Sequence, residues 1–183
     1  MFIGRRRTSR AKRTRGAEVL EFTFVFLPMI MMIIVLIDIA WAIFVKATLE
    51  YAVRVGVRSG ITITGTQAST AGSDLTTMVK SIVQQSSIGI LRGSSGLSKI
   101  KVHYFQPPAE GSSAQPVDVS NQTWGNTPLY IMQVSVEGYM LPALVPRIFG
   151  LGKAIDNSST AISAVSADLI EPSRDVPPIG SAP

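Results

Sequence analysis

The stretch "FTFVFLPMIMMIIVLIDIAWAIFV", residues 22–45, decides how this chain of 183 residues is organised. Its first sixteen residues carry no formal charge, and Asp38 is the one charged side chain before Lys46. At 1.5 Å per residue a helix over this stretch is about 36 Å long, which is enough to cross a hydrocarbon core of about 30 Å with some tilt. The pattern therefore predicts a transmembrane helix over residues 17–45.

The residues that precede this stretch are strongly basic. Seven of the 17 Lys and Arg residues lie between Arg5 and Arg15, and all 12 acidic residues follow Gly16. Because positive charge stays on the cytoplasmic side, we expect a cytoplasmic N-terminus, with the chain after residue 45 outside the inner membrane. The excess charge belongs to a short leader and not to a folded basic face, so we do not expect a nucleic-acid partner.

Two residues mark the far end of the predicted span. Asp38 follows Glu21 by seventeen residues, or about 26 Å along a helix, so we expect its carboxylate near the outer interface and not at the midplane. Trp41 is suitably placed for the aromatic belt at the same level. We therefore predict Asp38 and Trp41 as membrane-interface residues.

Glu21, at the cytoplasmic end of the predicted span, is harder to explain. A carboxylate at the hydrocarbon boundary costs about 2 to 3 kcal/mol unless it is paired. If the chain were cut between Gly16 and Ala17, Glu21 would become the fifth residue of the product and Ala17 would carry a new ammonium group. The ammonium of an adjacent subunit is a natural partner for Glu21.

A basic leader, Gly16, Glu21 and Phe22 followed by an apolar helix resemble the processing signature of type IV pilin-like proteins. The Glu-Phe pair is similar to that of the Tad (tight adherence) class, and "WAIFVKATLEYAVRVGVRSG", residues 41–60, resembles the TadE-like segment. The resemblance covers roughly residues 11–60, with a weaker similarity at 160–172. It implies cleavage between Gly16 and Ala17 by a prepilin peptidase, and subunit assembly through Glu21 and Phe22. The implied partners are other pilins, the peptidase, the Tad inner-membrane platform and the lipid bilayer.

Two other interpretations of the N-terminal region remain open. "AWA" at residues 40–42 matches a secretory cleavage pattern, which would release a secreted domain cut after Ala42. Alternatively, the chain is an uncleaved membrane-anchored periplasmic scaffold or binding protein.

The rest of the sequence predicts a small α+β domain over residues 61–171. Residues 46–60 continue the first helix as an amphipathic half, because Leu49, Val53 and Val57 recur every four residues. A Gly/Ser/Thr-rich linker follows, and then a helix over 74–88 capped by Ser73. Strands are expected at 98–105, 128–140 and 160–170, giving a pilin-like three-stranded antiparallel sheet on which the helices pack.

The remaining segments have less regular patterns. Residues 106–128 predict a surface excursion that Trp124 attaches to the core. Residues 140–153 are compatible with an amphipathic helix touching lipid or with packing under the sheet. The tail, residues 172–183, is expected to be disordered.

Nothing in the sequence points to catalysis. His103 is the one histidine and lies on the polar side of a predicted strand, and the chain has no cysteine. We therefore expect no catalytic residue, no metal site and no cofactor. The sequence leads to the expectation of a minor pilin (pseudopilin) in a bacterial inner membrane, acting in pilus assembly, initiation or adhesion. A TadE-type or TadF-type role and the position in the fibre stay open.

Overall fold

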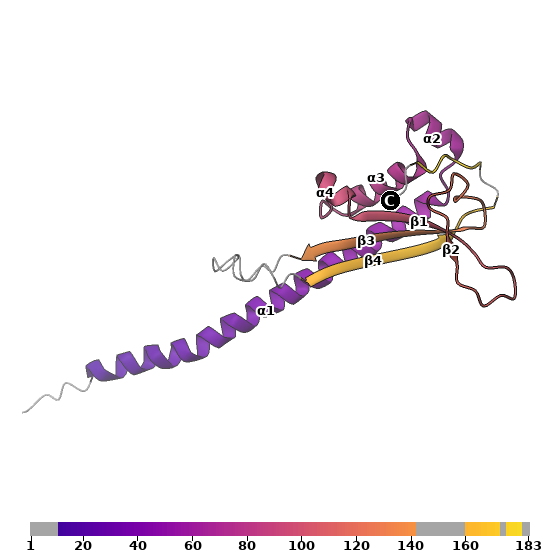
Figure 1. Ribbon diagram of the computed structural model, residues 1–183. Helices are drawn as coiled ribbons and strands as arrows, with labels where there is room; N and C mark the ends of the chain where they lie inside the picture. Colours follow the sequence, from indigo (N-terminus) through magenta and orange to yellow (C-terminus); the bar gives the residue numbers. More distant parts are fainter. Residues whose placement is uncertain (1–10, 142–159, 173–174, 181–183) are drawn as a thin grey trace, which may run out of the picture.

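The computed structural model describes residues 11–141, 160–172 and 175–180, and it shows one long helix that projects from an α+β domain (Figure 1). The first helix, α1, spans Ala11–Gly60, and the remaining elements follow it in the order helix, helix, helix and four strands. They are α2 (Gly65–Ala71), α3 (Leu75–Ser86), α4 (Gly93–Leu97), β1 (Ile100–Gln106), β2 (Val117–Asp118), β3 (Ile131–Leu141) and β4 (Thr160–Leu169). The predicted α+β class is confirmed.

Helix α1 has two halves with different surroundings. From Gly16 to Phe44 its side chains are exposed or half-buried, and burial begins at Val45. In the second half Leu49, Val53 and Val57 are buried in the core, as their spacing predicts. Pro28 lies inside the helix without ending it. One continuous helix thus joins an exposed apolar rod to the domain core.

Small residues let α3 approach the second half of α1 closely. Ala52, Gly56 and Gly60 recur every four residues, and all three are buried. A methyl group added at Gly56 would stand 2.3 Å from Cγ2 of Val83, well inside van der Waals contact. The stripe of small residues is therefore a helix-packing surface within the domain.

The segment between α1 and α3 differs from the predicted linker. Residues 65–71 form α2, because Thr64 and Gln67 make a reciprocal capping box in which each side chain bonds the other's backbone N–H. Helix α3 starts one residue later than predicted. Its N-cap is Asp74, whose carboxylate accepts a 2.7 Å hydrogen bond from the backbone N–H of Thr77.

The sheet has four antiparallel strands in the order β2-β1-β3-β4. The three predicted strands form the expected meander, with Val102 opposite Val134 and Val134 opposite Ser166. The difference from the prediction is β2, a two-residue edge strand in the excursion that pairs with Phe105 and Gln106. One face of the sheet covers α1 and α3 and supplies the core residues Ile100, Val102, Tyr104, Met132, Val134 and Val136.

The excursion between β1 and β3 is attached to the core differently from the prediction. Trp124 is half-exposed and makes an edge-to-face contact with Tyr130, with ring centroids 6.2 Å apart. The buried residues of the excursion are instead Val119, Ser120, Gly125 and Asn126. A small apolar side chain and polar groups with backbone partners thus hold this segment.

Residues 175–180 also differ from the expected disorder of the tail. The backbone N–H groups of Leu75 and Thr76, in the first turn of α3, donate hydrogen bonds to the carbonyls of Pro178 and Ile179. Those donors have no partner inside their own helix, so the tail satisfies them. Ile179 is buried, which anchors the segment further. Most of the predicted amphipathic segment 140–153 lies outside the described residues.

Candidate functional site

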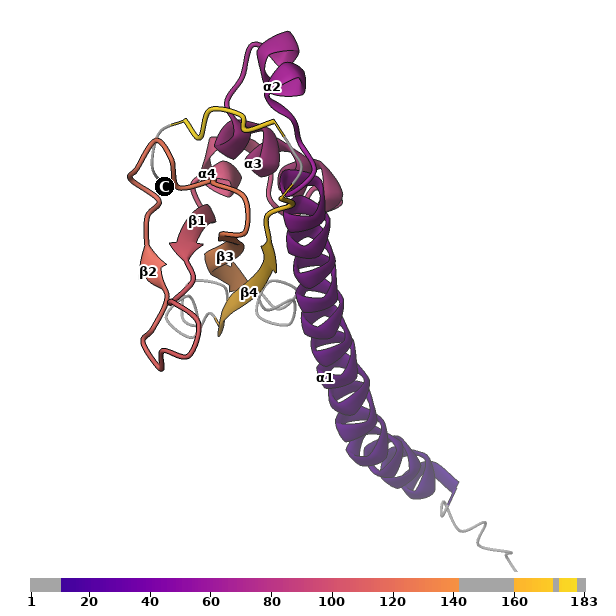
Figure 2. The same cartoon turned by 90° about the vertical axis from the view of Figure 1, so that its right-hand side faces the viewer.

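The first candidate site is the exposed half of α1, where the sequence predicts cleavage and assembly. Gly16, Ala17, Glu21 and Phe22 all lie in the helix and are all exposed. No atom beyond the local helix lies within 4 Å of where a side chain on Gly16 would begin, so no other part of the described chain packs on the helix there. Figure 2 shows this half of the helix extending away from the domain.

The helix places the proposed cleavage and assembly residues in a fixed relation. Ala17 and Glu21 are four residues apart and therefore share one face, one turn from each other. Phe22 stacks on Phe26, with ring centroids 5.0 Å apart, so the aromatic rings form a continuous ridge. Among the side chains described, the ion pairs join Lys46 to Glu50 and His103 to Asp118, and neither includes Glu21.

The predicted interface residues lie where the exposed rod meets the domain. Asp38 and Trp41 are both half-buried, and Trp41 stacks on Phe44 with a centroid distance of 5.7 Å. Trp41 also packs against the edge of the hydrophobic core. The Trp41 ring therefore lies at the boundary between the domain and the exposed half of α1: one part of the ring is covered by the domain and the other faces outward.

Within the described residues, α1 is the one helix long and apolar enough to cross a membrane. No residue of its most apolar eighteen-residue window is buried in the described part of the structure. A buried core helix would be covered by its own domain, whereas this surface requires lipid or other apolar helices. A single exposed N-terminal helix of this kind indicates membrane anchoring.

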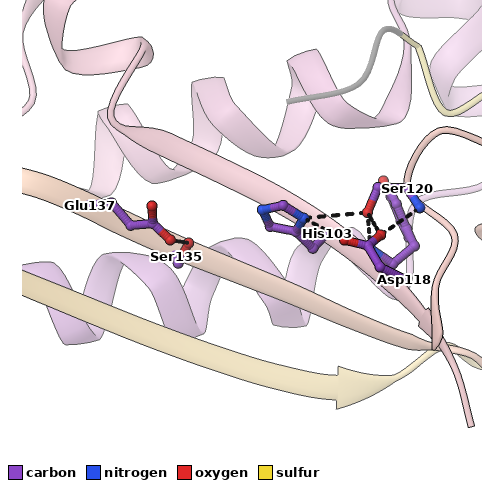
Figure 3. Close-up of polar contacts among 6 residues, drawn as sticks. His103, Asp118, Ser120, Ser135 and Glu137 are labelled. Atoms are coloured by element: carbon purple, nitrogen blue, oxygen red, sulfur yellow. Dashed lines mark hydrogen bonds and ion pairs between the residues drawn. The ribbon is translucent and has the colours of Figure 1, made fainter. Parts of the chain in front are cut away.

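A second candidate site is a polar cluster at the β1–β2 edge of the sheet (Figure 3). Nδ1 of His103 lies 3.3 Å from a carboxylate oxygen of Asp118 and 3.4 Å from the hydroxyl of Ser120. Ser120 donates a 2.5 Å hydrogen bond to Asp118 and accepts one from the backbone N–H of Tyr104. Sequence reasoning found His103 but missed Asp118 and Ser120, because the excursion brings them back to the sheet.

This cluster does not have the geometry of a Ser-His-Asp relay. In a relay the serine and the carboxylate contact different nitrogens of the histidine, whereas here both contact Nδ1. The Ser120 hydroxyl already donates its hydrogen bond to Asp118, so His103 does not activate the serine. The arrangement instead ties the two-residue edge strand to β1.

The charge balance of the cluster favours an ionised Asp118. Burial raises the pKa of the Asp118 carboxyl, but hydrogen bonds from the Ser120 hydroxyl and backbone N–H, with the charge of His103, outweigh it. The net result is a lowered pKa. The Asp118 side chain is about half-exposed, so this is a local tie and not a buried charge.

The domain also has shallow surface cavities. One of about 330 Å³ lies between α3 and α4 and is lined by Lys80, Gln84 and Leu97 among others. Burial lowers the pKa of the Lys80 ammonium, nearby Lys101 lowers it further, and Asp74 opposes both. Another, of about 270 Å³, lies between residues 120–123 and 178–180. No group of three or more potential metal ligands occurs in the parts of the chain that the structure describes.

Comparison with protein families identifies the helix. Residues 16–58 match the family model described as TadE-like protein. This segment of the chain is similar to TadE-like proteins. No curated protein and no solved structure matches the chain.

The TadE-like match has informative limits. It begins at Gly16, the residue before the predicted cut, and ends at Arg58, two residues before α1 ends. The match thus contains both halves of the helix and excludes the sheet. The resemblance stated from residues 11–60 is confirmed over this range, and with the exposed apolar helix it fits a membrane protein associated with Tad pili.

Proposed function

We propose that this chain is a minor pilin, or pseudopilin, of a Tad-type pilus, processed by a prepilin peptidase and held in the bacterial inner membrane until assembly. The observation that carries the proposal is the coincidence of three features at one point. The basic leader ends at Gly16, the TadE-like match begins there, and the exposed apolar helix follows at once. The N-terminus would be cytoplasmic and the α+β domain periplasmic, or at the cell surface once in a fibre.

In the proposed mechanism the exposed half of α1 is first an anchor and then an assembly surface. In the membrane the apolar side chains from Phe22 to Phe44 contact lipid. During assembly they exchange lipid for the equivalent helices of other pilins, which costs little because both environments are apolar. The Tad inner-membrane platform is the proposed site of this exchange.

During this exchange Glu21 would fix the axial position of one subunit relative to its neighbour. An unpaired carboxylate at the hydrocarbon boundary is unfavourable, so the helix gains free energy when the ammonium of Ala17 from a neighbour approaches. The gain falls off steeply with distance, and it therefore favours one axial offset between subunits. Phe22 and Phe26 lie beside this pair and would help to exclude water from it.

The alternative of a secreted domain cut after Ala42 is less compatible with the observed burial. Ala42 is half-buried beside the domain, and Val45, Thr48 and Leu49, just beyond it, are buried. Gly16 and Ala17, in contrast, are both exposed. The position in the fibre, and whether the domain contributes to initiation or to adhesion, are parts of the proposal that need assembly experiments.

The proposal is tested by replacing Glu21 with Gln and comparing it with the matched variant Glu18→Gln, one turn earlier in the helix and also exposed. We expect Glu21→Gln to insert in the membrane and to be processed, but to lose co-purification with other pilins and to lose piliation. Glu18→Gln should retain both. Normal piliation of Glu21→Gln would refute the pairing mechanism.

A further inference from the structure

One end of the α+β domain faces the same direction as the apolar half of α1. Helix α3 runs back along α1, so the connection from α3 to α4 lies at the same end of the sheet as the beginning of β1, the end of β3 and the beginning of β4 (Figure 1). Hydrogen bonds join the residue before β1 to the last part of β3: the backbone N–H of Glu137 donates to the carbonyl of Lys99 over 2.9 Å, and Nζ of Lys99 donates to the carbonyl of Gly138 over 2.6 Å. We call residues 87–92, together with residues 138–141 of β3, the anchor-side end of the domain.

The anchor-side end lies at the level where α1 leaves an apolar environment. About 30 Å of hydrocarbon accounts for twenty residues of helix, so a span that starts at Phe22 ends near Trp41. The domain begins to cover α1 at the same level, because Trp41 packs on the core edge and Val45 is buried. Tyr139 and Leu141 of β3 pack against the same core. The end of the sheet therefore lies next to the exit point of the helix.

This end exposes apolar side chains that a soluble surface does not need. Ile88 is 72% exposed, more than any other large hydrophobic residue that the structure describes outside α1, and Met140 is 54% exposed. Phe44 of α1 is also half-exposed. Exposed apolar groups that continue an existing membrane-contacting surface are suited to the boundary between headgroups and acyl chains.

The backbone at Ile88 is also unusual. Its φ is 51°, in the left-handed region that β-branched residues rarely adopt, and Gly, Asn or Asp would be favoured in such a turn. The Ile88 side chain is not part of the core, so core packing does not compensate this strain. Leu129, beyond the other end of β3, shares the exposure and the left-handed backbone, and what distinguishes Ile88 is its place at the end of the domain that faces the span.

Basic groups accompany the apolar ones. The side chain of Arg92 lies over Gly89, one residue from Ile88, and Lys99 is the residue just before β1. Glu137 is also exposed at this end, so the charge is mixed with a basic excess. An arginine beside an exposed isoleucine allows one turn to place its apolar part among acyl chains and its guanidinium among phosphates.

We propose that the anchor-side end of the domain rests on the lipid surface, with Ile88 and Met140 inserted at the boundary between headgroups and acyl chains. The occupant of this surface is the bilayer that holds α1. The domain is then held at a fixed tilt on the membrane and does not swing freely on its helix. This inference requires that α1 spans a membrane, but it does not require cleavage after Gly16.

The test uses the absence of cysteine in the sequence, which allows single labels in the full chain. Variants Ile88→Cys and Met140→Cys carry an environment-sensitive fluorophore and are reconstituted in vesicles of phosphatidylethanolamine and phosphatidylglycerol containing lipids with a nitroxide on the acyl chain. The matched control is Leu129→Cys, which is 59% exposed and has a φ of 71° but lies at the opposite end of β3. Ile33→Cys, within the span, reports insertion of α1.

We expect the labels at 88 and 140 to lose at least about half of their fluorescence to the nitroxide lipids, and the label at 129 to lose less than about a tenth, because insertion of about 5 to 10 Å reaches the quencher. Quenching at 33 without excess quenching at 88 and 140 would overturn the inference while leaving the anchor intact. Energy transfer between labels at 88 on different copies, without quenching by lipid, would also overturn it, since a second copy would then cover the surface. No quenching at 33 would remove the anchor itself, and the inference with it.

Discussion

Replacing Gly56 with Ala tests whether the outer half of α1 is held by α3 as the structure shows. The new methyl carbon would lie 2.3 Å from Cγ2 of Val83 and 3.7 Å from Cγ1 of Val79. Carbon atoms normally approach to about 3.5 Å, so the first contact overlaps by more than 1 Å. Val83 is fully buried and cannot turn into solvent, so the helices have to separate.

Two opposing effects decide the magnitude. Ala is favoured over Gly inside a helix by about 1 kcal/mol. Overpacking of this kind costs about 1 to 3 kcal/mol. We therefore expect Gly56→Ala to lower the free energy of unfolding by about 1 kcal/mol, or to lower Tm by about 4 °C for a domain of this size.

The assay is thermal unfolding of the full chain in detergent, followed through the near-ultraviolet signal of the buried aromatic residue Tyr104. The decisive comparison is made in a Val83→Ala background, where the overlapping methyl group is absent. There Gly56→Ala should be stabilising by about 1 kcal/mol, so that its effect changes sign and the coupling is about 2 kcal/mol. An equal stabilisation by Gly56→Ala in both backgrounds would refute the close packing of α1 on α3.

Three further predictions concern the turn, the cluster and the tail. Ile88→Gly relieves a left-handed backbone and should raise the free energy of unfolding by about 1 kcal/mol in urea titrations; a loss of stability would mean that the side chain packs in the fold. The lowered pKa of Asp118 stabilises the folded state above the unfolded pKa of about 4, and this contribution is lost as the pH falls through the folded value. The slope of the free energy of unfolding against pH, between about pH 5 and pH 2, should thus be smaller in Asp118→Asn. An unchanged slope would contradict the stabilisation of the Asp118 carboxylate by Ser120. Asn126 is buried and donates from Nδ2 to the carbonyl of Pro177, so Asn126→Ala should cost about 1 to 2 kcal/mol and speed hydrogen exchange at residues 175–180. Unchanged exchange there would show that the bonds to α3 and the burial of Ile179 hold the tail without Asn126.

The main architecture could be predicted from the sequence because its signals are periodic and local. The apolar run at 22–45 and the four-residue spacing of Leu49, Val53 and Val57 both indicate α1, and both hold in the structure. Alternation indicates β1 and β3 in the same way. The helix cap at Asp74 was misplaced by one residue, because Ser73 and Asp74 are both good N-cap residues and the choice depends on which side chain reaches Thr77.

The remaining features depend on contacts between distant parts of the chain. Residues 175–180 have the composition of a disordered tail, yet free backbone donors at α3 and the buried pocket for Ile179 hold them. Strand β2 has two residues, too few for any pattern, and it exists because the excursion returns to β1. Asp118 and Ser120 reach His103 by the same route, so neither could be assigned to a cluster from spacing.

The exposed apolar helix could be predicted, but the surface at Ile88 and Met140 could not. Ile88 comes one residue after the last position of the four-residue repeat Leu75, Val79, Val83 and Ser87, and its backbone is left-handed. Met140 is the last residue but one of β3, a strand whose register changes between Val136 and Tyr139, which alters the side to which the last residues point. Backbone irregularities of this kind have no signature in hydropathy.

The most direct test of the central claim is the mass of the N-terminus of protein extracted from membranes, with and without a co-expressed prepilin peptidase. The account predicts a chain that begins at Ala17 when the peptidase is present and at Met1 when it is absent. A chain that begins at Met1 in both samples would contradict processing and leave a plain membrane anchor. A chain that begins at Ile43 would contradict the anchor and identify a secreted domain.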